Sequence, residues 1–306
     1  MPTRRDLLRL IAAAGVGSVL PWRPGRGEEA RAMLTRKIPK SGEAVPVIGL
    51  GTSNVFDVED SEGALRPIEE VVRAFVDGGA RLVDSSPMYG RAERVTGDVV
   101  GKLGVRERLF LATKVWTKGR EEGIRQMEAS IAAMRAGTMD LIQVHNLVDV
   151  KTHLATLRAW KEAGRVRYVG ITHYRVDAFA DLETLLREET LDFVQLNYSI
   201  GVRDAEKRLL PLAAERGVAV LVNRPFEDGA LFGRVKGKAV PAWGAELGCA
   251  SWAQVFLKFV VSHPAVTCAI PATAKVAHMR DNLAAGTGPM PDAAQRARMA
   301  QAWDAA

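Results

Sequence analysis

The sequence predicts a single α/β domain, a (β/α)8 or TIM barrel, and three observations carry this prediction. Eight short runs rich in Val, Ile and Leu follow one another along the chain, as expected for parallel strands buried on both faces. Longer helical patterns separate the runs, at a spacing of roughly 30 residues that is typical of strand–helix repeats. Finally, 306 residues are enough for one barrel of about 250 residues with an extension.

The elements are expected in strict alternation. The strands are expected at residues 45–52, 81–86, 109–115, 140–146, 166–172, 192–199, 219–225 and 267–273. The helices are expected near residues 66–78, 91–103, 118–136, 151–164, 175–188, 204–216, 251–262 and 276–285. Gly164 and Gly217, like the pair Gly78 and Gly79, stand where a helix C-terminus favours a residue with positive φ. Ser251 is placed to cap the N-terminus of the helix that follows it.

The main rival is a doubly wound dinucleotide-binding fold, whose first turn reads G-x-G-x-x-G. Here Gly49 and Gly51 are followed by Asn54 where the third glycine belongs, so this turn is absent. The chain also lacks the P-loop, the H-E-x-x-H zinc motif and the G-x-S-x-G nucleophile motif. A closed barrel without a bound metal is therefore preferred.

The basic charge of the chain is concentrated at its N-terminus. Residues 1–32 contain six arginines and three acidic residues, so they carry about half of the formal net charge of +6. No basic stripe remains on the expected barrel, and we expect no nucleic-acid partner. Cys249 and Cys268 form no C-x-x-C pair, and their spacing leaves open whether they are buried thiols or a disulfide.

The first 32 residues resemble a twin-arginine (Tat) signal peptide. Arg4 and Arg5 precede an apolar run at residues 10–20, which is too short to span a bilayer, so no stable membrane span is expected. Ala30 and Ala32 frame an A-x-A cleavage site. We therefore expect a signal peptide at residues 1–32, read by the Tat export machinery, and a barrel domain at residues 33–306. The resemblance implies a periplasmic location after export in folded form.

Four polar residues lie at or just after the ends of three successive expected strands, where α/β barrels carry their active sites: Asp84, Tyr89, Lys114 and His145. Reduction of a carbonyl needs a proton donor for the oxygen. An ammonium group beside a Tyr lowers the phenol pKa, and a carboxylate holds that ammonium charged. A His can hydrogen-bond the carbonyl oxygen, while a cofactor must supply the hydride.

These residues are also where the chain resembles the aldo-keto reductase superfamily. The segment from Asp84 to Gly90 is similar to that family's D-T-(S/A)-x-x-Y-G motif, and Lys114 and His145 lie on strands similar to its lysine and histidine strands. The resemblance implies that Asp84, Tyr89, Lys114 and His145 are catalytic and that the cofactor is NADP(H). It implies the cofactor-binding residues Gly51, Thr52, Thr172, His173, Gln195, Asn223, Arg224, Thr273, Lys275, Arg280 and Asn282.

Two stretches depart from the family pattern near the expected nicotinamide. Thr172-His173 stand where the family has Ser-Asn, and Asn223-Arg224 stand where it places a stacking Tyr. The loops should add a substrate pocket formed by Phe56, Trp116, Asn146 and Phe226.

The expected function is reduction of an aldehyde or ketone, or oxidation of the corresponding alcohol. Two other classes stay open at this point. One is a non-catalytic barrel that binds or senses a nucleotide, which the two departures favour. The other is a barrel hydrolase or lyase that needs no nicotinamide, since the fold supports many chemistries.

Overall fold

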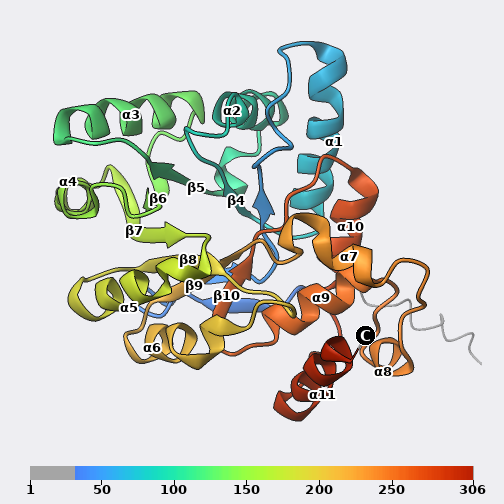
Figure 1. Ribbon diagram of the computed structural model, residues 1–306. Helices are drawn as coiled ribbons and strands as arrows, with labels where there is room; N and C mark the ends of the chain where they lie inside the picture. Colours follow the sequence, from blue (N-terminus) through green and yellow to red (C-terminus); the bar gives the residue numbers. More distant parts are fainter. Residues whose placement is uncertain (1–31, 306) are drawn as a thin grey trace, which may run out of the picture. The chain divides into compact units, whose positions relative to one another are not determined.

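The computed structural model describes residues 32–305, and these contain one closed barrel of eight parallel strands (Figure 1). Each strand pairs with the next along the chain, from β3 to β10. The strands are β3 (Leu50–Gly51), β4 (Leu82–Asp84), β5 (Phe110–Val115), β6 (Met139–His145), β7 (Val166–His173), β8 (Phe193–Asn197), β9 (Ala219–Asn223) and β10 (Val266–Ala269). Parallel bridges from Ile48 to Ala269 and from Gly51 to Ala272 join the first strand to the last. The predicted (β/α)8 barrel is therefore confirmed.

Helices surround the strands, as Figure 1 shows. Those that follow the strands in order are α1 (Glu62–Asp77), α2 (Ala92–Leu103), α3 (Arg120–Ala133), α4 (Val150–Glu162), α5 (Phe179–Glu188), α6 (Leu209–Glu215), α9 (Trp252–Val261) and α10 (Val276–Ala284). Ser251 caps α9 by accepting a hydrogen bond from the Gln254 backbone, as predicted. Gly164 and Gly217 have positive φ just after their helices, which L side chains adopt at a cost.

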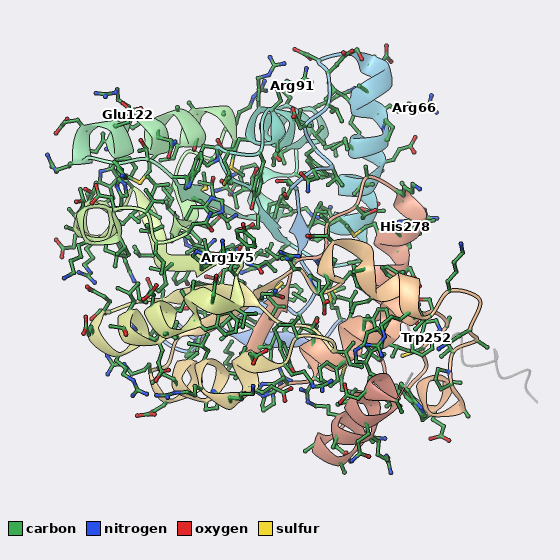
Figure 2. The ribbon with its side chains drawn as sticks, in the orientation of Figure 1. Arg66, Arg91, Glu122, Arg175, Trp252 and His278 are labelled. Atoms are coloured by element: carbon green, nitrogen blue, oxygen red, sulfur yellow. The ribbon has the colours of Figure 1, made fainter. Side chains whose placement is uncertain are left out.

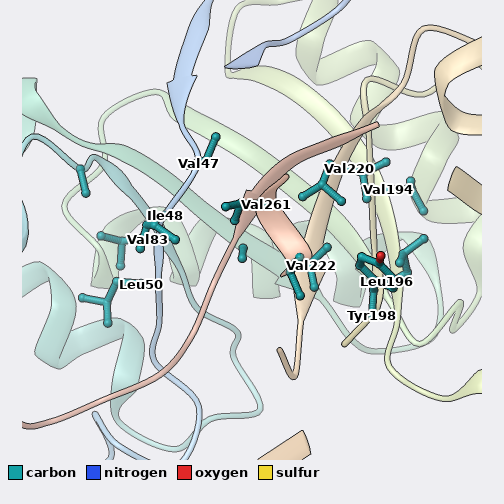
Figure 3. Close-up of a cluster of buried hydrophobic side chains, with 14 of the residues drawn as sticks. Val47, Ile48, Leu50, Val83, Val194, Leu196, Tyr198, Val220, Val222 and Val261 are labelled. Carbon is teal, nitrogen blue, oxygen red and sulfur yellow. The ribbon is translucent and has the colours of Figure 1, made fainter. Parts of the chain in front are cut away.

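Two apolar layers hold the barrel together. Outward-facing side chains of the strands pack against the helices, and Figure 3 shows part of this layer around Leu50, Val83, Val194, Val220 and Val261. Inward-facing side chains fill the barrel itself, and these include Leu82, Phe110, Leu141, Tyr168, Phe193 and Leu221. Because side chains alternate between the faces of a strand, the inward set determines which later residues of each strand also face inward.

The first predicted strand, residues 45–52, is wrong in extent. Its beginning belongs to β2 (Ala44–Pro46), which pairs antiparallel with β1 (Thr35–Lys37), and only β3 enters the barrel. Ile38 and Val45 of this hairpin belong to the same buried cluster as Phe110, so the hairpin covers the bottom of the barrel interior. Proline lacks the N–H group that a central strand donates, and this is consistent with a break at Pro46.

Three further helices were not predicted. The short α7 (Ala230–Arg234) and α8 (Ala242–Glu246) lie in the connection between β9 and α9, and α11 (Ala293–Asp304) follows α10. Asp292 and Gln295 form a capping box at the start of α11, which is a sequence signal that could have revealed this helix.

Other expectations concern the chain's ends and its cysteines. The compact unit comprises Ala32–Ala306, and the predicted signal peptide lies outside the described residues except for Ala32. Among the helices of residues 32–305, none has both the length and the apolar character that a membrane span requires.

Cys249 and Cys268 are both buried free thiols, so the disulfide left open by the sequence is not formed.

Candidate active site

The alternation of side chains brings a set of polar residues to one end of the barrel interior. Along β6, Leu141 faces inward, so Gln143 and His145 do too; along β5, Phe110 is followed by Lys114 on the same face. The same rule turns Asp84, Thr172, Gln195 and Asn223 inward at the carboxyl ends of their strands. A cavity of about 990 Å³ opens at this end, and most of these residues line it.

Lys114 is fully buried among these polar residues, with an exposed fraction of 0%. Its Nζ lies 2.6 Å from Asp84 Oδ2 and 2.6 Å from the carbonyl oxygen of Ser85. Burial alone would lower the pKa of Lys114, but the neighbouring Asp84 carboxylate and Tyr89 outweigh it and raise the pKa above its usual value. The ammonium is therefore charged at neutral pH.

Tyr89 lies above this ion pair, on the cavity wall. Lys114 Nζ is 5.1 Å from the centre of the Tyr89 ring, and Lys114 and Ser53 both hydrogen-bond the Tyr89 hydroxyl. Burial raises the pKa of Tyr89, and the lowering effect of Lys114 does not overcome it. The sequence led us to expect that Lys114 lowers the pKa of Tyr89, and the direction of this expectation is wrong. The pKa is raised instead, because burial of the Tyr89 side chain outweighs the nearby charge of Lys114. Tyr89 keeps its proton at neutral pH.

His145 stands beside Tyr89 at the end of β6. The two rings are perpendicular, with centres 6.0 Å apart, and His145 Nδ1 lies 3.0 Å from Ser86 Oγ. Burial, followed by the charge of Lys114, lowers the pKa of His145 to about 2. His145 is therefore a neutral imidazole at any physiological pH.

Two side-chain amides hold the other oxygen of Asp84. Gln195 Nε2 donates to Asp84 Oδ1 at 3.0 Å and Gln143 Nε2 donates to the same atom at 3.2 Å. Sequence reasoning missed Gln143, although a polar residue in an apolar strand was a usable signal. Gly170 leaves room for it, because a Cβ there would lie 3.2 Å from Gln143 Cγ and 2.7 Å from the Phe193 carbonyl oxygen.

The residues expected to bind a nicotinamide gather around Gln195. Its Oε1 accepts hydrogen bonds from Thr172 Oγ1 at 3.1 Å and from Asn223 Nδ2 at 3.3 Å. Gly51 and Thr52 line the cavity nearby, and a Cβ on Gly51 would lie 2.7 Å from the Ile270 carbonyl oxygen. Only glycine permits this close approach of β3 to the chain after β10.

Arg224 and His173 differ in their access to the cavity. Arg224 lines it in a left-handed conformation, with φ of 50°, and pairs with Asp228 at 2.8 Å. His173 does not line it: the His173 ring stacks on Tyr174, and its Nδ1 accepts from the Arg175 backbone. Tyr174 occupies the cavity wall instead.

Near α10, two of the residues expected to bind the cofactor do not reach the cavity, and two others that were not predicted do. Thr273 and Asn282 line the cavity as expected, but Lys275 and Arg280 are exposed and do not. His278 and Asp281 do line it. Figure 2 shows His278 on α10 and Trp252 at the start of α9, and both residues line the cavity.

Of the four residues predicted to form the substrate pocket, two line the cavity and two do not. Asn146 and Phe226 line the cavity. Phe56 is fully buried in the hydrophobic core, because a turn from Thr52 carries it under the barrel rim. Trp116 is 42% exposed and its backbone is bound to Gln126 of α3, so it lies outside the cavity lining. Met88 and Phe232, which lie in loops expected to form the pocket, line the cavity as well, and so do Tyr174 and Trp252, which were not predicted.

The fold and this site define a class: a TIM barrel with an inward Lys–Asp pair beside a tyrosine. The profile of the Aldo/keto reductase family matches residues 47–303, and the chain belongs to this family. It is 30% identical over 262 residues to methylglyoxal reductase YeaE of Escherichia coli (strain K12), covering 82% of this chain and 89% of that protein. It is 28% identical over 247 residues to glyoxal reductase of Bacillus subtilis (strain 168), covering 79% and 83%.

Solved structures show the same fold. An aldo/keto reductase from Klebsiella pneumoniae in complex with NADP and acetate superposes with a TM-score of 0.72 at 22% identity, covering 89% of this chain and 95% of that one. The resemblance to the family inferred from the sequence is therefore confirmed. The catalytic and cofactor-binding roles of individual residues stay predictions.

Proposed function

We propose that this chain is an NADP(H)-dependent carbonyl reductase that converts an aldehyde or ketone to an alcohol. The observation that carries the proposal is the position of the buried Lys114 between Asp84 and Tyr89, two residues that line a large cavity. Membership of the Aldo/keto reductase family and the NADP bound in the Klebsiella structure support the same reaction class.

Each of the four residues has a role that its environment allows. Tyr89 donates a proton to the carbonyl oxygen, and the ammonium of Lys114 stabilises the phenolate that remains. Asp84 orients that ammonium and compensates its charge. Neutral His145 hydrogen-bonds the carbonyl oxygen and directs it toward Tyr89.

The residues at the carboxyl ends of β6, β7, β8 and β9 fit a nicotinamide. Asn146 Oδ1 and Asn223 Oδ1 are buried in the cavity wall and have no hydrogen-bond donor within residues 32–305. A carboxamide NH2 would satisfy an unpaired acceptor of this kind, whose burial is otherwise unfavourable. Thr172, Gln195 and Asn223 would hold this end of the cofactor, and residues at the start of α10 would hold the adenosine end. The bound cofactor supplies a hydride to the carbonyl carbon.

The substrate we propose is a small 2-oxo aldehyde such as methylglyoxal. The two relatives described above are named methylglyoxal reductase and glyoxal reductase, and the alignment covers most of each. Asn146, next to His145, lines the cavity with its side-chain amide. The Nδ2–H of this amide could donate a hydrogen bond to a second oxygen beside the reacting carbonyl.

The test is a titration of the full chain with NADPH and NADH, followed by tryptophan fluorescence, and then turnover of methylglyoxal followed by NADPH absorbance. We expect NADPH binding and turnover in the wild type. Tyr89→Phe should bind NADPH equally well but lose turnover by at least about 100-fold, because only the proton donor is removed.

The possible outcomes separate the open alternatives. Binding of NADPH without turnover of any carbonyl by the wild type would favour a nucleotide-binding barrel. A folded chain that binds neither cofactor would contradict the reductase proposal and favour a hydrolase or lyase.

We also propose that residues 1–32 direct export to the periplasm by the Tat pathway. The support is the sequence pattern around Arg4 and Arg5 alone. The chain should appear in the periplasmic fraction of a bacterium with this pathway, shortened after Ala32. Replacing both arginines by lysine should retain it in the cytoplasm. A periplasmic location that survives this replacement, or its absence in the wild type, would contradict the proposal.

A further inference from the structure

Which nitrogen of His145 carries the proton decides what this residue can do. A neutral imidazole has one N–H donor and one bare acceptor, and the hydrogen bond made by one nitrogen determines the state of the other. Only a ring with the proton on the nitrogen toward the cavity can donate to a carbonyl oxygen. The opposite tautomer would present a lone pair to that oxygen and repel it.

The hydroxyl of Ser86 is the partner of the inner nitrogen. Ser86 is fully buried, and its Oγ lies 3.0 Å from His145 Nδ1. The same Oγ accepts a hydrogen bond from the Met88 backbone N–H at 3.3 Å. The Ser86 carbonyl oxygen also accepts from the Tyr89 backbone at 3.0 Å, so the serine is held within a tight turn that leads to Tyr89.

This arrangement decides the direction of the Ser86–His145 hydrogen bond. Within residues 32–305, His145 Nδ1 is the one acceptor that the Ser86 hydroxyl reaches. If Nδ1 carried the proton instead, Ser86 Oγ would accept twice and its own proton would be buried without an acceptor. An unsatisfied buried donor costs on the order of 1–3 kcal/mol. Ser86 therefore donates, and Nδ1 accepts.

The remaining nitrogen, Nε2, then carries the proton. His145 lines the cavity beside Tyr89, and Nε2 has no hydrogen-bond partner in the described part of the chain. Two donors of the protein, the Tyr89 hydroxyl and His145 Nε2–H, are then available to one oxygen atom in the cavity.

We propose that Ser86 is a positioning residue that holds His145 as the Nε2–H tautomer, so that His145 donates a hydrogen bond to the carbonyl oxygen of the substrate. The substrate part of this inference rests on the proposed reductase function, whereas the tautomer does not. Ser86 itself does not line the cavity.

The test is nuclear magnetic resonance of the full chain labelled with ¹⁵N-histidine. Long-range ¹H–¹⁵N correlations distinguish a protonated ring nitrogen from a bare one, and the chain has five histidines. The His145 signals are identified by their loss in His145→Gln. At pH 7 we expect a bare Nδ1 and a protonated Nε2 in the wild type. In Ser86→Ala the Nδ1 signal should shift toward the average of the two tautomers.

Two further variants sharpen this experiment. Ser85→Ala removes a neighbouring buried hydroxyl, which contacts Thr52 Oγ1 at 2.9 Å and not His145, and should leave the His145 signals unchanged. Ser86→Cys retains a weak donor of similar size and should restore part of the wild-type pattern. A protonated Nδ1 in the wild type, or identical His145 signals in wild type and Ser86→Ala, would overturn the proposal.

A kinetic measurement tests the consequence for catalysis. Ser86→Ala should lower kcat/KM for the carbonyl substrate by about tenfold, the effect of one hydrogen bond, with NADPH affinity unchanged. If the chain reduces no carbonyl at all, the proposed function fails while the tautomer assignment stands on the spectra. If the spectra change and kcat/KM does not, the link from Ser86 to catalysis is refuted.

Discussion

Lys114 Nζ and Asp84 Oδ2 lie 2.6 Å apart inside the barrel, where neither side chain is more than 3% exposed. A buried ion pair adds little stability relative to apolar residues, because both charges lose their hydration. Its persistence in a core of Leu, Val and Ile therefore indicates a functional constraint, which agrees with the family to which the chain belongs.

Lys114→Met should destabilise the protein by about 3–5 kcal/mol, because it leaves the Asp84 carboxylate buried without its counter-charge. Urea unfolding followed by circular dichroism measures this loss. The double variant Lys114→Met/Asp84→Asn should recover part of the stability, yet remain inactive. If Lys114→Met alone were as stable as the wild type, the carboxylate would have to be compensated in another way.

Stability should fall as the pH drops below neutrality. Burial lowers the pKa of His145 to about 2 and that of His263 to about 4, against an ordinary value of 6.5. Because the pKa of each histidine is lower in the folded chain, the unfolded chain binds more protons below pH 6.5. The stability that the neutral histidines contribute is therefore fully present above pH 6.5 and is lost as the pH falls. For His145, the decrease in the free energy of unfolding approaches ~1.4 kcal/mol for each pH unit below 6.5.

Urea unfolding at pH 7.0, 6.0 and 5.0 measures this dependence, and His145→Gln is the control. The control variant should show a shallower decrease, since its side chain does not titrate. Equal slopes for wild type and His145→Gln would show that His145 is not buried in its neutral form.

Gly97 permits close packing of α2 against α3. A Cβ at this position would overlap the Ala133 carbonyl oxygen, and the backbone there cannot yield cheaply. Gly97→Ala should therefore destabilise the protein by about 1–3 kcal/mol despite the better helix propensity of alanine. Gly63 in α1 meets nothing within 4 Å, so Gly63→Ala should be neutral or stabilising by up to about 1 kcal/mol. Urea midpoints that rank the two variants in the opposite order would contradict the close contact between α2 and α3.

His278, rather than Lys275, should contribute to NADPH affinity. Both side chains are exposed, but His278 lines the cavity and Lys275 does not. We expect His278→Gln to raise the Kd for NADPH roughly three- to tenfold, the effect of one charge-assisted contact, and Lys275→Gln to change it less. Fluorescence titration of both variants measures the difference, and a larger effect of Lys275→Gln would restore the hypothesis made from the sequence.

The sequence by itself determined the barrel and the inward polar set. Strands alternate their side chains with a period of two, so the apolar run in each strand already decides that Asp84, Lys114 and His145 share the interior with Gln195. Burial on both faces requires continuous apolar runs, and this made eight parallel strands readable in one chain. These properties depend on neighbouring residues alone.

Only the tertiary structure decided where the loop residues lie and which polar groups bond one another. Phe56 enters the core rather than the pocket because a turn at Thr52 reverses the chain, and sequence spacing does not reveal this direction. His278 on α10 lines the cavity, whereas Lys275, the N-cap residue before that helix, does not. The Ser86–His145 hydrogen bond joins residues 59 positions apart, and only the pairing of β4, β5 and β6 in one sheet brings these two side chains together.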